Sequence, residues 1–444
     1  MEVCSTMSKL KTQQLPNTEL HKLISNISPS IGRILNKALE GKDITTNEIT
    51  ALLTCKSTEL NSIMLTADYL RSKTVGDKVT YVVNRNINFT NVCIKGCGFC
   101  AFSRDFRTEE SYFLPTEEII RRGKQAYQLG ATELCIQAGL PPKMKGDYYI
   151  ELCNSIKKEI PEINVHGFSP EEVLYGAVRS KMTIKEYLIG LKDAKVSSLP
   201  GTSAEILDQN LRDIISPGRI TVDQWIEVIT TAHKVGIPTT STMMYGHIES
   251  SEHVAKHLVL LRNIQKSTGG FTEFVPLSFI FDEAPMFKKN SIKNLRKGPT
   301  GIEVVKIHAV SRIALNNWIP NIQVSWPKEG PQVAQILLNS GVNDMGGTLM
   351  NESISTSAGA QHGQLLRPKE IRKLIWDSER TPAERYTDYS IRKIFSEDDG
   401  VNDPLDDLDG NTEQIFGSYQ QLINMPQYKY IHPNKTEKKL QSPS

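Results

Sequence analysis

After Gly76 the chain alternates short apolar or β-branched runs with longer segments of helical periodicity, and it does so eight times. The intervening segments, such as TEEIIRRGKQAYQLG and TVDQWIEVITTAHKVG, space apolar residues three and four positions apart and end at a glycine, which is typical of helices. Strands that alternate with helices pair in parallel through crossovers. The eight runs are VTYVVNRNINFT from Val79, TELCIQAG from Thr132, INVHGFSP from Ile163, VSSLPGTS from Val196, PTTSTMMYGH from Pro238, FTEFVPLSF from Phe271, NIQVSW from Asn321 and VNDMGGTL from Val342.

This alternation predicts an α/β fold, a closed (β/α)8 TIM-type barrel over residues 76–385. An open doubly wound sheet is the structural alternative, although no G-x-G-x-x-G turn follows the first run. Residues 1–75 are mostly polar, with helix-like apolar spacing between Asn47 and Leu70, and predict a helical N-terminal extension. Beyond Arg385 the pattern fades into SEDDGVNDPLDDLDGNTE and HPNKTEKKLQSPS. Residues 386–444 are therefore predicted to form a polar, partly disordered C-terminal tail.

Composition excludes several classes of protein. The 444 residues carry a net charge of only +2, which argues against a nucleic-acid-binding protein. No apolar run reaches the roughly 18 residues that a membrane span needs. The first residues, MEVCSTMSKLKTQQLPNTEL, lack the apolar core of a secretion signal. We therefore expect a cytoplasmic enzyme without membrane or nucleic-acid partners.

Three of the seven cysteines fall within eight residues. Cys93, Cys97 and Cys100 are spaced C-x3-C-x2-C directly after the first predicted strand, at the expected mouth of the barrel. Thiolates are the usual ligands of iron–sulfur clusters, and three of them on a four-iron cube leave one iron open. The alternatives are a zinc site and three incidental buried cysteines. A structural zinc ion requires a fourth ligand, and the next candidates, Cys135 and His166, lie far along the chain.

Polar residues gather in the predicted strand runs, where a barrel would place them at its C-terminal mouth. Ser169 precedes Pro170 and two glutamates, so we favour a helix N-cap for it. His247 fits equally well as a cap of backbone groups and as a substrate contact. Gln323 alternates with apolar neighbours and is expected to face the barrel interior. The full set comprises Gln137, His166, Ser169, His247, Gln323, Ser325, Asn343 and Asp344.

The cysteine motif, with Phe99 before the last cysteine, resembles the signature of radical S-adenosylmethionine (SAM) enzymes. The resemblance implies a radical SAM barrel in which Cys93, Cys97 and Cys100 hold a [4Fe-4S] cluster. SAM would chelate the open iron, and one electron would split it into methionine and a 5′-deoxyadenosyl radical. The resemblance also implies that Phe99 lies beside the adenine and that the Ala138–Gly139 turn meets the SAM amino group.

Further segments across residues 75–385 resemble one family of these enzymes, the tyrosine-utilising subunits of deazaflavin (FO) synthase. TEFVPL and NDMGGTLMNESIS are the more specific segments. The resemblance implies a 5-amino-6-(D-ribitylamino)uracil–L-tyrosine 4-hydroxyphenyl transferase of coenzyme F(420) biosynthesis, with an electron donor and a ring-closing FO synthase subunit as partners. Segments like MMYGH and TGGF also occur in the alternatives, the menaquinone futalosine-pathway enzymes aminofutalosine synthase and dehypoxanthine futalosine cyclase. Phe281 stands where a histidine is expected.

The implied reaction removes hydrogen from the tyrosine amino group and breaks the Cα–Cβ bond, which releases 2-iminoacetate. The 4-hydroxybenzyl fragment then adds to the uracil carbon that bears the amino group, and loss of an electron completes the adduct. Such a reaction needs a dry pocket with polar partners for a phenol, a uracil and a ribityl chain. The candidate substrate contacts are His166, His247, Gln323 and Asn343.

Overall fold

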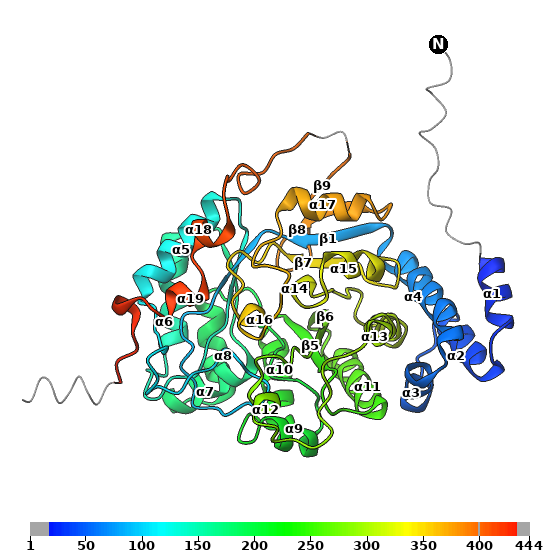
Figure 1. Cartoon of the computed structure of the whole chain (residues 1–444), viewed down its shortest axis with the longest axis horizontal. Helices are drawn as coiled ribbons and strands as arrows, with labels where there is room; N and C mark the ends of the chain where they lie inside the picture. Colours follow the sequence, from blue (N-terminus) through cyan, green and yellow to red (C-terminus); the bar gives the residue numbers. More distant parts are fainter. Residues whose placement is uncertain (1–16, 398–399, 433–444) are drawn as a thin grey trace, which may run out of the picture.

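Parallel pairing joins the eight predicted runs in the computed structural model, which describes residues 17–397 and 400–432 (Figure 1). The first run divides into two strands, of which the second pairs with β3 and β3 pairs with β4. Strand β5 pairs with β6, and β7 pairs back to β1. The strands of the ring are β1 (Lys78–Val82), β2 (Asn84–Ile87), β3 (Glu133–Ile136), β4 (Asn164–His166), β5 (Thr239–Tyr245), β6 (Phe271–Ser278) and β7 (Asp344–Gly347).

Two of the eight runs are too irregular to count as named strands, yet they complete the ring. Ser198 bridges to His166 of β4, and Leu199 bridges to Thr239 of β5. Ile322 bridges to β6 and Gln323 to β7, again in parallel. The parallel pairs therefore pass through all eight runs and return to the first, which is the TIM-type arrangement predicted from the alternation.

Helices surround this ring. The two helices predicted from periodicity are present as α5 and α10, and α10 ends at Gly236 with a φ of 84°, a conformation that glycine adopts without strain. The helices of this region are α5 (Thr116–Gln128), α6 (Tyr148–Glu159), α7 (Pro170–Ser180), α8 (Ile184–Asp193), α9 (Gln209–Ile215), α10 (Val222–Val235), α11 (Ser251–Thr268), α12 (Pro285–Lys288), α13 (Gly301–Leu315), α14 (Trp326–Glu329), α15 (Pro331–Leu338), α16 (Ile354–Ser357) and α17 (Pro368–Trp376).

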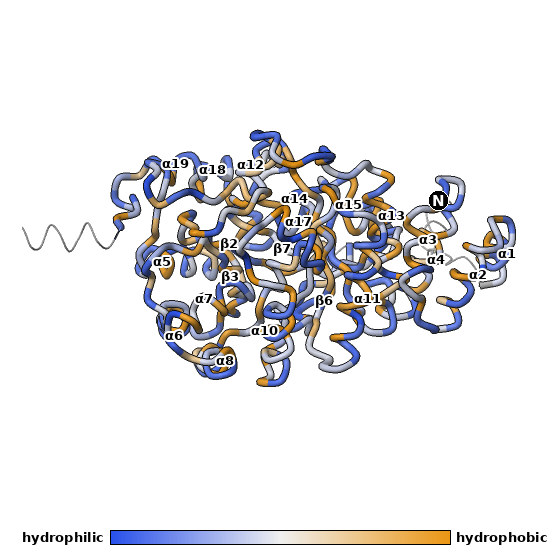
Figure 2. The backbone as a smooth tube through the Cα atoms, turned by 90° about the horizontal axis from the view of Figure 1, so that it is seen from below, coloured by the Kyte–Doolittle hydropathy of each residue, from blue (hydrophilic) through white to orange (hydrophobic). Residues whose placement is uncertain are grey.

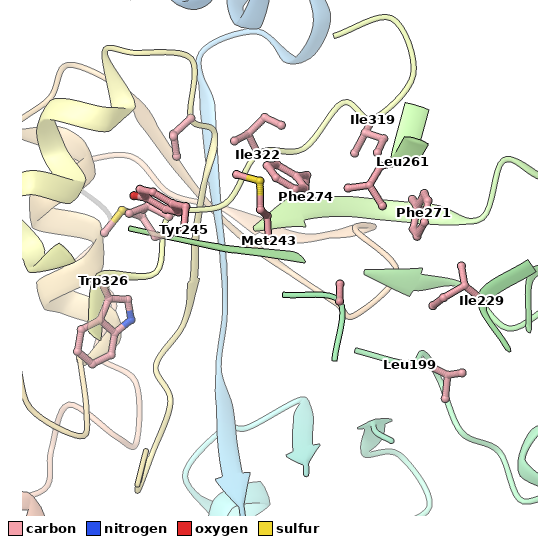
Figure 3. Packing of buried hydrophobic residues seen from close by; sticks show 14 of the residues in the cluster. Leu199, Ile229, Met243, Tyr245, Leu261, Phe271, Phe274, Ile319, Ile322 and Trp326 are labelled. Carbon is pink, nitrogen blue, oxygen red and sulfur yellow. The ribbon is translucent and has the colours of Figure 1, made fainter. Parts of the chain in front are cut away.

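Side chains alternate along the strands between the helices and the barrel interior. In β5, Met243 and Tyr245 pack outward, beside Phe274 and Ile322 from the neighbouring segments (Figure 3). Thr242, between the two, instead lines an internal cavity. Figure 2 shows hydrophobic (orange) and hydrophilic (blue) residues interleaved in short stretches along the trace. The apolar core therefore lies mainly between strands and helices, and the barrel interior is left polar and partly open.

The N-terminal residues form four helices, as predicted for a helical extension. They are α1 (Asn17–Ser25), α2 (Pro29–Leu39), α3 (Thr46–Thr54) and α4 (Leu60–Val75). The amphipathic stretch 47–70 is two helices, α3 and α4, because Cys55 and Lys56 adopt extended backbone angles between them. Helix α4 packs on α13 and α3 packs on α11, at the end of the molecule opposite to α18 and α19 (Figures 1 and 2). Residues 1–16 lie outside the described residues.

The predicted tail is the main correction to the domain boundaries. Strand β8 (Thr381–Arg385) pairs in parallel with β1, and β9 (Ile391–Ile394) folds back on β8, so residue 385 lies inside a hairpin. Helices α18 (Thr412–Phe416) and α19 (Tyr419–Leu422) pack against the barrel through buried Phe416, Tyr419 and Leu422. The prediction of a surface tail is therefore wrong for residues 386–397 and 400–432. Phe395, Leu405 and Ile423 are buried as well, although the apolar residues of this segment form no periodic pattern and Ile391 and Ile394 of β9 are exposed. Residues 433–444 lie outside the described residues.

Within the described ranges, 17–397 and 400–432, no helix combines the length and apolar character that a membrane span requires.

Candidate active site in the barrel mouth

A cavity of about 420 Å³ opens inside the ring, lined by the carboxyl ends of its strands and the loops that follow them. The loop after β2 contributes the three clustered cysteines, and the turn after β3 contributes Ala138 and Gly139. Glu172, in the first turn of α7, and Ser203, in the loop after residues 196–199, complete the wall. This is the mouth where barrel enzymes carry out catalysis, so the predicted location of the site agrees with the cavity.

The loop from residue 91 to residue 104 carries Cys93, Cys97 and Cys100, and all three thiols are free and line the cavity. Backbone hydrogen bonds hold this loop to its surroundings. The N–H of Cys93 donates to Arg104 O at 3.1 Å, and the N–H of Gly98 donates to Ile215 O at 2.8 Å. The cysteines are therefore presented from a backbone that is tied at several points.

Electrostatics at the loop are set by burial and by one arginine. Burial raises the pKa of the Cys97 thiol to about 12 and also raises that of Cys93. The Nη1 of Arg219 lies 3.5 Å from Cys97 Sγ and opposes this rise by favouring the thiolate. Arg219 is itself held by the carboxylates of Glu171 and Glu205, at 3.2 and 3.0 Å.

The donor chemistry of this loop fits an iron–sulfur cluster. Cys93, Cys97 and Cys100 are soft thiol donors on one cavity wall, beside a buried cation that stabilises negative charge. In the described part of the chain, no three His, Cys, Asp or Glu side chains converge on a point where they could share one metal ion. The ligands of a four-iron cube each bind a different iron, so they do not need to converge in this way.

The turn that was expected to meet SAM packs directly on the cysteine-bearing loop. A Cβ on Gly139 would lie 2.2 Å from the backbone oxygen of Val92, so only glycine permits this approach. The N–H of Ala138 donates to Glu172 Oε1 at 3.1 Å. Phe99 lines the cavity, with the Arg219 guanidinium 5.9 Å from its ring centroid. The three residues predicted to contact SAM therefore share one wall with the cysteines.

Glu172 connects this turn to helix α7. Its carboxylate accepts hydrogen bonds from the N–H and the hydroxyl of Ser169, at 2.8 and 2.6 Å, as well as from Ala138. Ser169 in turn accepts from the N–H of Glu172, which confirms its predicted role as an N-cap. Burial raises the pKa of the Glu172 carboxyl to about 7.

Two of the four candidate substrate contacts line the cavity. His166 contacts the hydroxyl of Ser198, and burial lowers the pKa of its imidazole. Gln323 donates to Glu273 Oε2 at 2.7 Å. Both residues line the cavity, and for Gln323 this agrees with the inward orientation that the alternation predicts.

His247 and Asn343 do not line the cavity, and their prediction as contacts is corrected by the structure. His247 follows the turn at Gly246 and is fully buried, with Nε2 3.0 Å from Met244 O and Nδ1 3.3 Å from Glu249. It therefore satisfies local groups, the alternative considered for it. Asn343 precedes the first residue of β7 and so lies at the opposite end of the barrel, where it accepts from Arg312 at 2.7 Å.

Other cavity residues were not singled out from the sequence. The floor is formed by Glu133 and Glu273 from the strands and by Arg385, Thr387 and Tyr389 from the β8–β9 hairpin. Burial raises the pKa of Glu273, and its carboxylate accepts from the Tyr389 hydroxyl. Glu133 in the apolar run TELCI and Glu273 in TEFVPL could have been recognised from the sequence as site residues, because a charged side chain in a buried strand needs a partner. Phe281, the position of the expected histidine, packs on Phe287.

Comparisons with known proteins agree with this geometry. Residues 87–261 match the Radical SAM superfamily, and residues 268–397 match the CofH/MqnC C-terminal region. A 5-amino-6-(D-ribitylamino)uracil–L-tyrosine 4-hydroxyphenyl transferase of Methanothermobacter thermautotrophicus is 47% identical over 82% of this chain and 98% of its own length. The protein of that name from Methanocaldococcus jannaschii is 49% identical over 73% of this chain and 90% of its own. An FO synthase of Mycobacterium leprae is 43% identical over 78% of this chain, which spans only 40% of that enzyme.

Solved structures support the fold. HydG, a maturase of the [FeFe]-hydrogenase, superposes with a TM-score of 0.64 at 17% identity, over 84% of this chain and 80% of its own. Methylornithine synthase (PylB) superposes with a TM-score of 0.60 at 20% identity, over 78% of this chain and 95% of its own. These likenesses confirm the predicted barrel architecture, and the identity to full-length relatives confirms the predicted family. The chain therefore belongs to the family of 5-amino-6-(D-ribitylamino)uracil–L-tyrosine 4-hydroxyphenyl transferases, within the radical SAM superfamily.

Proposed function

We propose that this protein transfers the 4-hydroxybenzyl group of L-tyrosine to 5-amino-6-(D-ribitylamino)uracil, and releases 2-iminoacetate, methionine and 5′-deoxyadenosine. The observation that carries the proposal is the 47% identity over 98% of the length of a relative that bears this activity in its name. The bond between Cα and Cβ of tyrosine breaks, and a bond forms between the benzyl carbon and the uracil carbon that bears the amino group. The adduct serves FO synthesis.

Cys93, Cys97 and Cys100 would hold the [4Fe-4S] cluster, and Phe99 with the Ala138–Gly139 turn would hold SAM. When bound, these two cofactors supply the radical that starts the reaction. Glu172 fixes the turn by accepting from the Ala138 N–H at 3.1 Å. Arg219 keeps a positive charge beside the Cys97 thiolate. The protein thus binds and orients the cofactors from one wall of the cavity.

The remaining walls suit two polar organic substrates. The cavity lies inside the ring of strands, which limits the access of water to reactive fragments. His166 and Gln323 are polar residues that line the cavity. Lys328 and Glu352 line the upper wall, and burial lowers the pKa of Lys328 and raises that of Glu352. These groups offer hydrogen bonds to a phenol, a carboxylate and a ribityl chain.

The proposal includes two protein partners, a one-electron donor for the cluster and a ring-closing FO synthase subunit that receives the adduct. The relative named FO synthase, more than twice as long as the matching part, supports a connection between this reaction and ring closure. We place the protein in the cytoplasm, where thiols such as the free cysteines of the loop stay reduced.

The test is an anaerobic incubation of the reconstituted protein with SAM, a reductant, ring-labelled tyrosine and the aminouracil. We expect the ring label to appear in a product whose mass combines the aminouracil and the hydroxybenzyl fragment, with one 5′-deoxyadenosine per product. A parallel incubation offers the substrates of the futalosine-pathway enzymes. Consumption of a futalosine while tyrosine stays intact would overturn the proposal.

A further inference from the structure

Three asparagines form a ladder on the inner wall of the barrel. Asn84 and Asn86 belong to β2, and Asn88 directly follows this strand. They alternate with Arg85 and Ile87, so all three side chains point the same way, about 7 Å apart from one to the next. All three line the cavity. The ladder runs from Glu133 at the floor, which Asn84 contacts at 2.9 Å, to the Gln137 carbonyl beside the SAM turn, which Asn88 contacts at 2.7 Å.

Each of the upper two asparagines has an amide oxygen without a hydrogen-bond partner. Among the described residues that line the cavity, three have a side-chain atom that is buried without a hydrogen-bond partner. These atoms are the Oδ1 atoms of Asn86 and Asn88 and the Oγ1 atom of Thr202. The Nδ2 of Asn86 also has no protein partner in the described part of the chain. Buried polar groups in native proteins are nearly always paired, so such atoms in a cavity indicate a ligand that completes them.

Asn84 provides an internal comparison. Its Nδ2 donates to Glu133, and its Oδ1 accepts from the N–H of Leu349 at 2.9 Å. Asn84 is therefore a structural part of the floor. Asn86, whose side chain points the same way, has an amide oxygen without a hydrogen-bond partner. Asn86 pairs with Cys135 of β3 in the sheet, and Cys135 pairs with His166 of β4. The three residues therefore lie at the same level of the barrel.

We propose that Asn86 is the specificity-determining residue for the aminouracil and binds its imide edge. A primary amide presents one acceptor and one donor side by side. The imide edge of a uracil presents an N–H beside a carbonyl, so the two groups form a paired hydrogen bond. The Oδ1 of Asn88, whose Nδ2 is occupied by Gln137, accepts from an amine of the same substrate. One carbonyl carbon of the imide is bonded to the carbon that forms the new bond, and the imide N–H lies one ring atom further away. A hydrogen bond in the plane of the ring at the imide therefore leaves the faces of the reacting carbon free.

This inference rests on the proposed function and is tested with an altered substrate as well as with variants. The aminouracil methylated at the imide nitrogen lacks the N–H that is proposed to donate a hydrogen bond to Asn86 Oδ1. We expect this methylation to raise the KM of the wild-type enzyme about 10- to 100-fold, the usual range for loss of a paired hydrogen bond to a base. The Asn86→Ala variant should raise the KM for the unmodified aminouracil by a similar factor and should no longer discriminate against the methylated compound.

The readouts separate this role from a structural one. In Asn86→Ala, the KM for tyrosine, the iron content and SAM cleavage without aminouracil should match the wild type. Asn154→Ala, on the exposed face of α6, is the matched control and should keep the full discrimination. If the wild-type enzyme had the same KM for the methylated aminouracil as for the unmodified one, the inference would be overturned without any variant. Wild-type enzyme that does not use the aminouracil at all would overturn the proposed function itself.

Discussion

The guanidinium Nε of Arg385 lies 2.6 Å from Asp344 Oδ2, and the two side chains, 4% and 0% exposed, form a buried ion pair at the floor of the barrel. Arg385 ends β8, and Asp344 begins β7. Replacing Arg385 with Met leaves a buried carboxylate without its partner. We expect the free energy of unfolding to fall by about 3–5 kcal/mol, measured by urea denaturation.

The control is Lys373→Ala. Lys373 pairs with Asp377 on the surface of α17, with side chains 74% and 48% exposed. Such exposed pairs contribute about 0.3–0.5 kcal/mol. A loss in Arg385→Met no larger than that of the control would show that the hairpin does not depend on this pair.

Glu172 predicts a pH dependence of stability. Burial raises the pKa of its carboxyl to about 7, whereas an unfolded chain titrates near 4.3. Between these values the folded protein holds a proton that the unfolded chain has released. The contribution of Glu172 to stability is therefore greatest at the low-pH end and falls as pH rises from about 4.3 to about 7. Glu172→Gln cannot ionise, so its melting temperature relative to wild type should rise across this window and level off above it.

Glu186 is the matched control, because it fills the same capping-box position in α8 but is exposed. Hydrogen bonds from Thr183 lower the pKa of its carboxyl, so its contribution is present above the unfolded pKa and lost at lower pH. Glu186→Gln should therefore show the opposite slope, confined to the acid side of the window. Parallel slopes for the two variants would contradict the assignment to Glu172.

The cysteine loop predicts a sharp division among cysteine variants. Cys93→Ala, Cys97→Ala and Cys100→Ala should each lose the iron, the labile sulfide and the formation of 5′-deoxyadenosine, because each thiolate is proposed to bind a separate iron. Cys153→Ala, on the buried face of α6, should retain all three, and so should Cys135→Ala in β3. Iron and sulfide analysis after anaerobic reconstitution provides the measurement. Full cluster content in a variant of the first group would refute the ligand assignment.

The sequence predicts most of the ring because the pattern that specifies it is local. Each run buries its apolar residues against helices, and the polar residues between them face inward, so Gln323 could be placed correctly from its neighbours alone. The cysteine motif is contiguous and needed no tertiary knowledge. The face of a strand on which a side chain lies could thus be predicted, but the residues at which the strand begins and ends could not. Asn343 was assigned to the mouth, whereas β7 begins one residue later and leaves it at the opposite end.

The floor of the cavity could not be predicted from any local pattern. Arg385, Thr387 and Tyr389 follow α17, the last helix around the barrel, in a stretch of polar residues that from composition alone resembles a surface segment. Their place inside the barrel depends on charges far away in the chain. Arg385 pairs with Asp344, Thr387 donates to Glu133 at 2.8 Å, and Tyr389 donates to Glu273. Only the fold brings these partners together.

The C-terminal helix α19 predicts a further dependence, that of the cysteine loop on Tyr419. The Tyr419 hydroxyl accepts from Asn91 Nδ2 at 3.1 Å and lies 3.4 Å from Phe102 O, and its ring centroid lies 5.4 Å from that of Phe102. Asn91 and Phe102 flank the three cysteines, so one side chain ties both ends of the loop.

Tyr419→Ala should lower the free energy of unfolding by about 3–5 kcal/mol, because a large buried ring is removed. Tyr419→Phe keeps the ring and loses only the hydroxyl contacts, at a cost of about 1 kcal/mol. The loop should also open more often, so the rate of iron release to a chelator should increase from wild type to the Phe variant and again to the Ala variant. Tyr127→Ala, at a position 46% exposed on α5, should release iron at the wild-type rate. If Tyr419→Ala released iron no faster than Tyr127→Ala, α19 would stabilise the fold without controlling the loop that carries the cysteines.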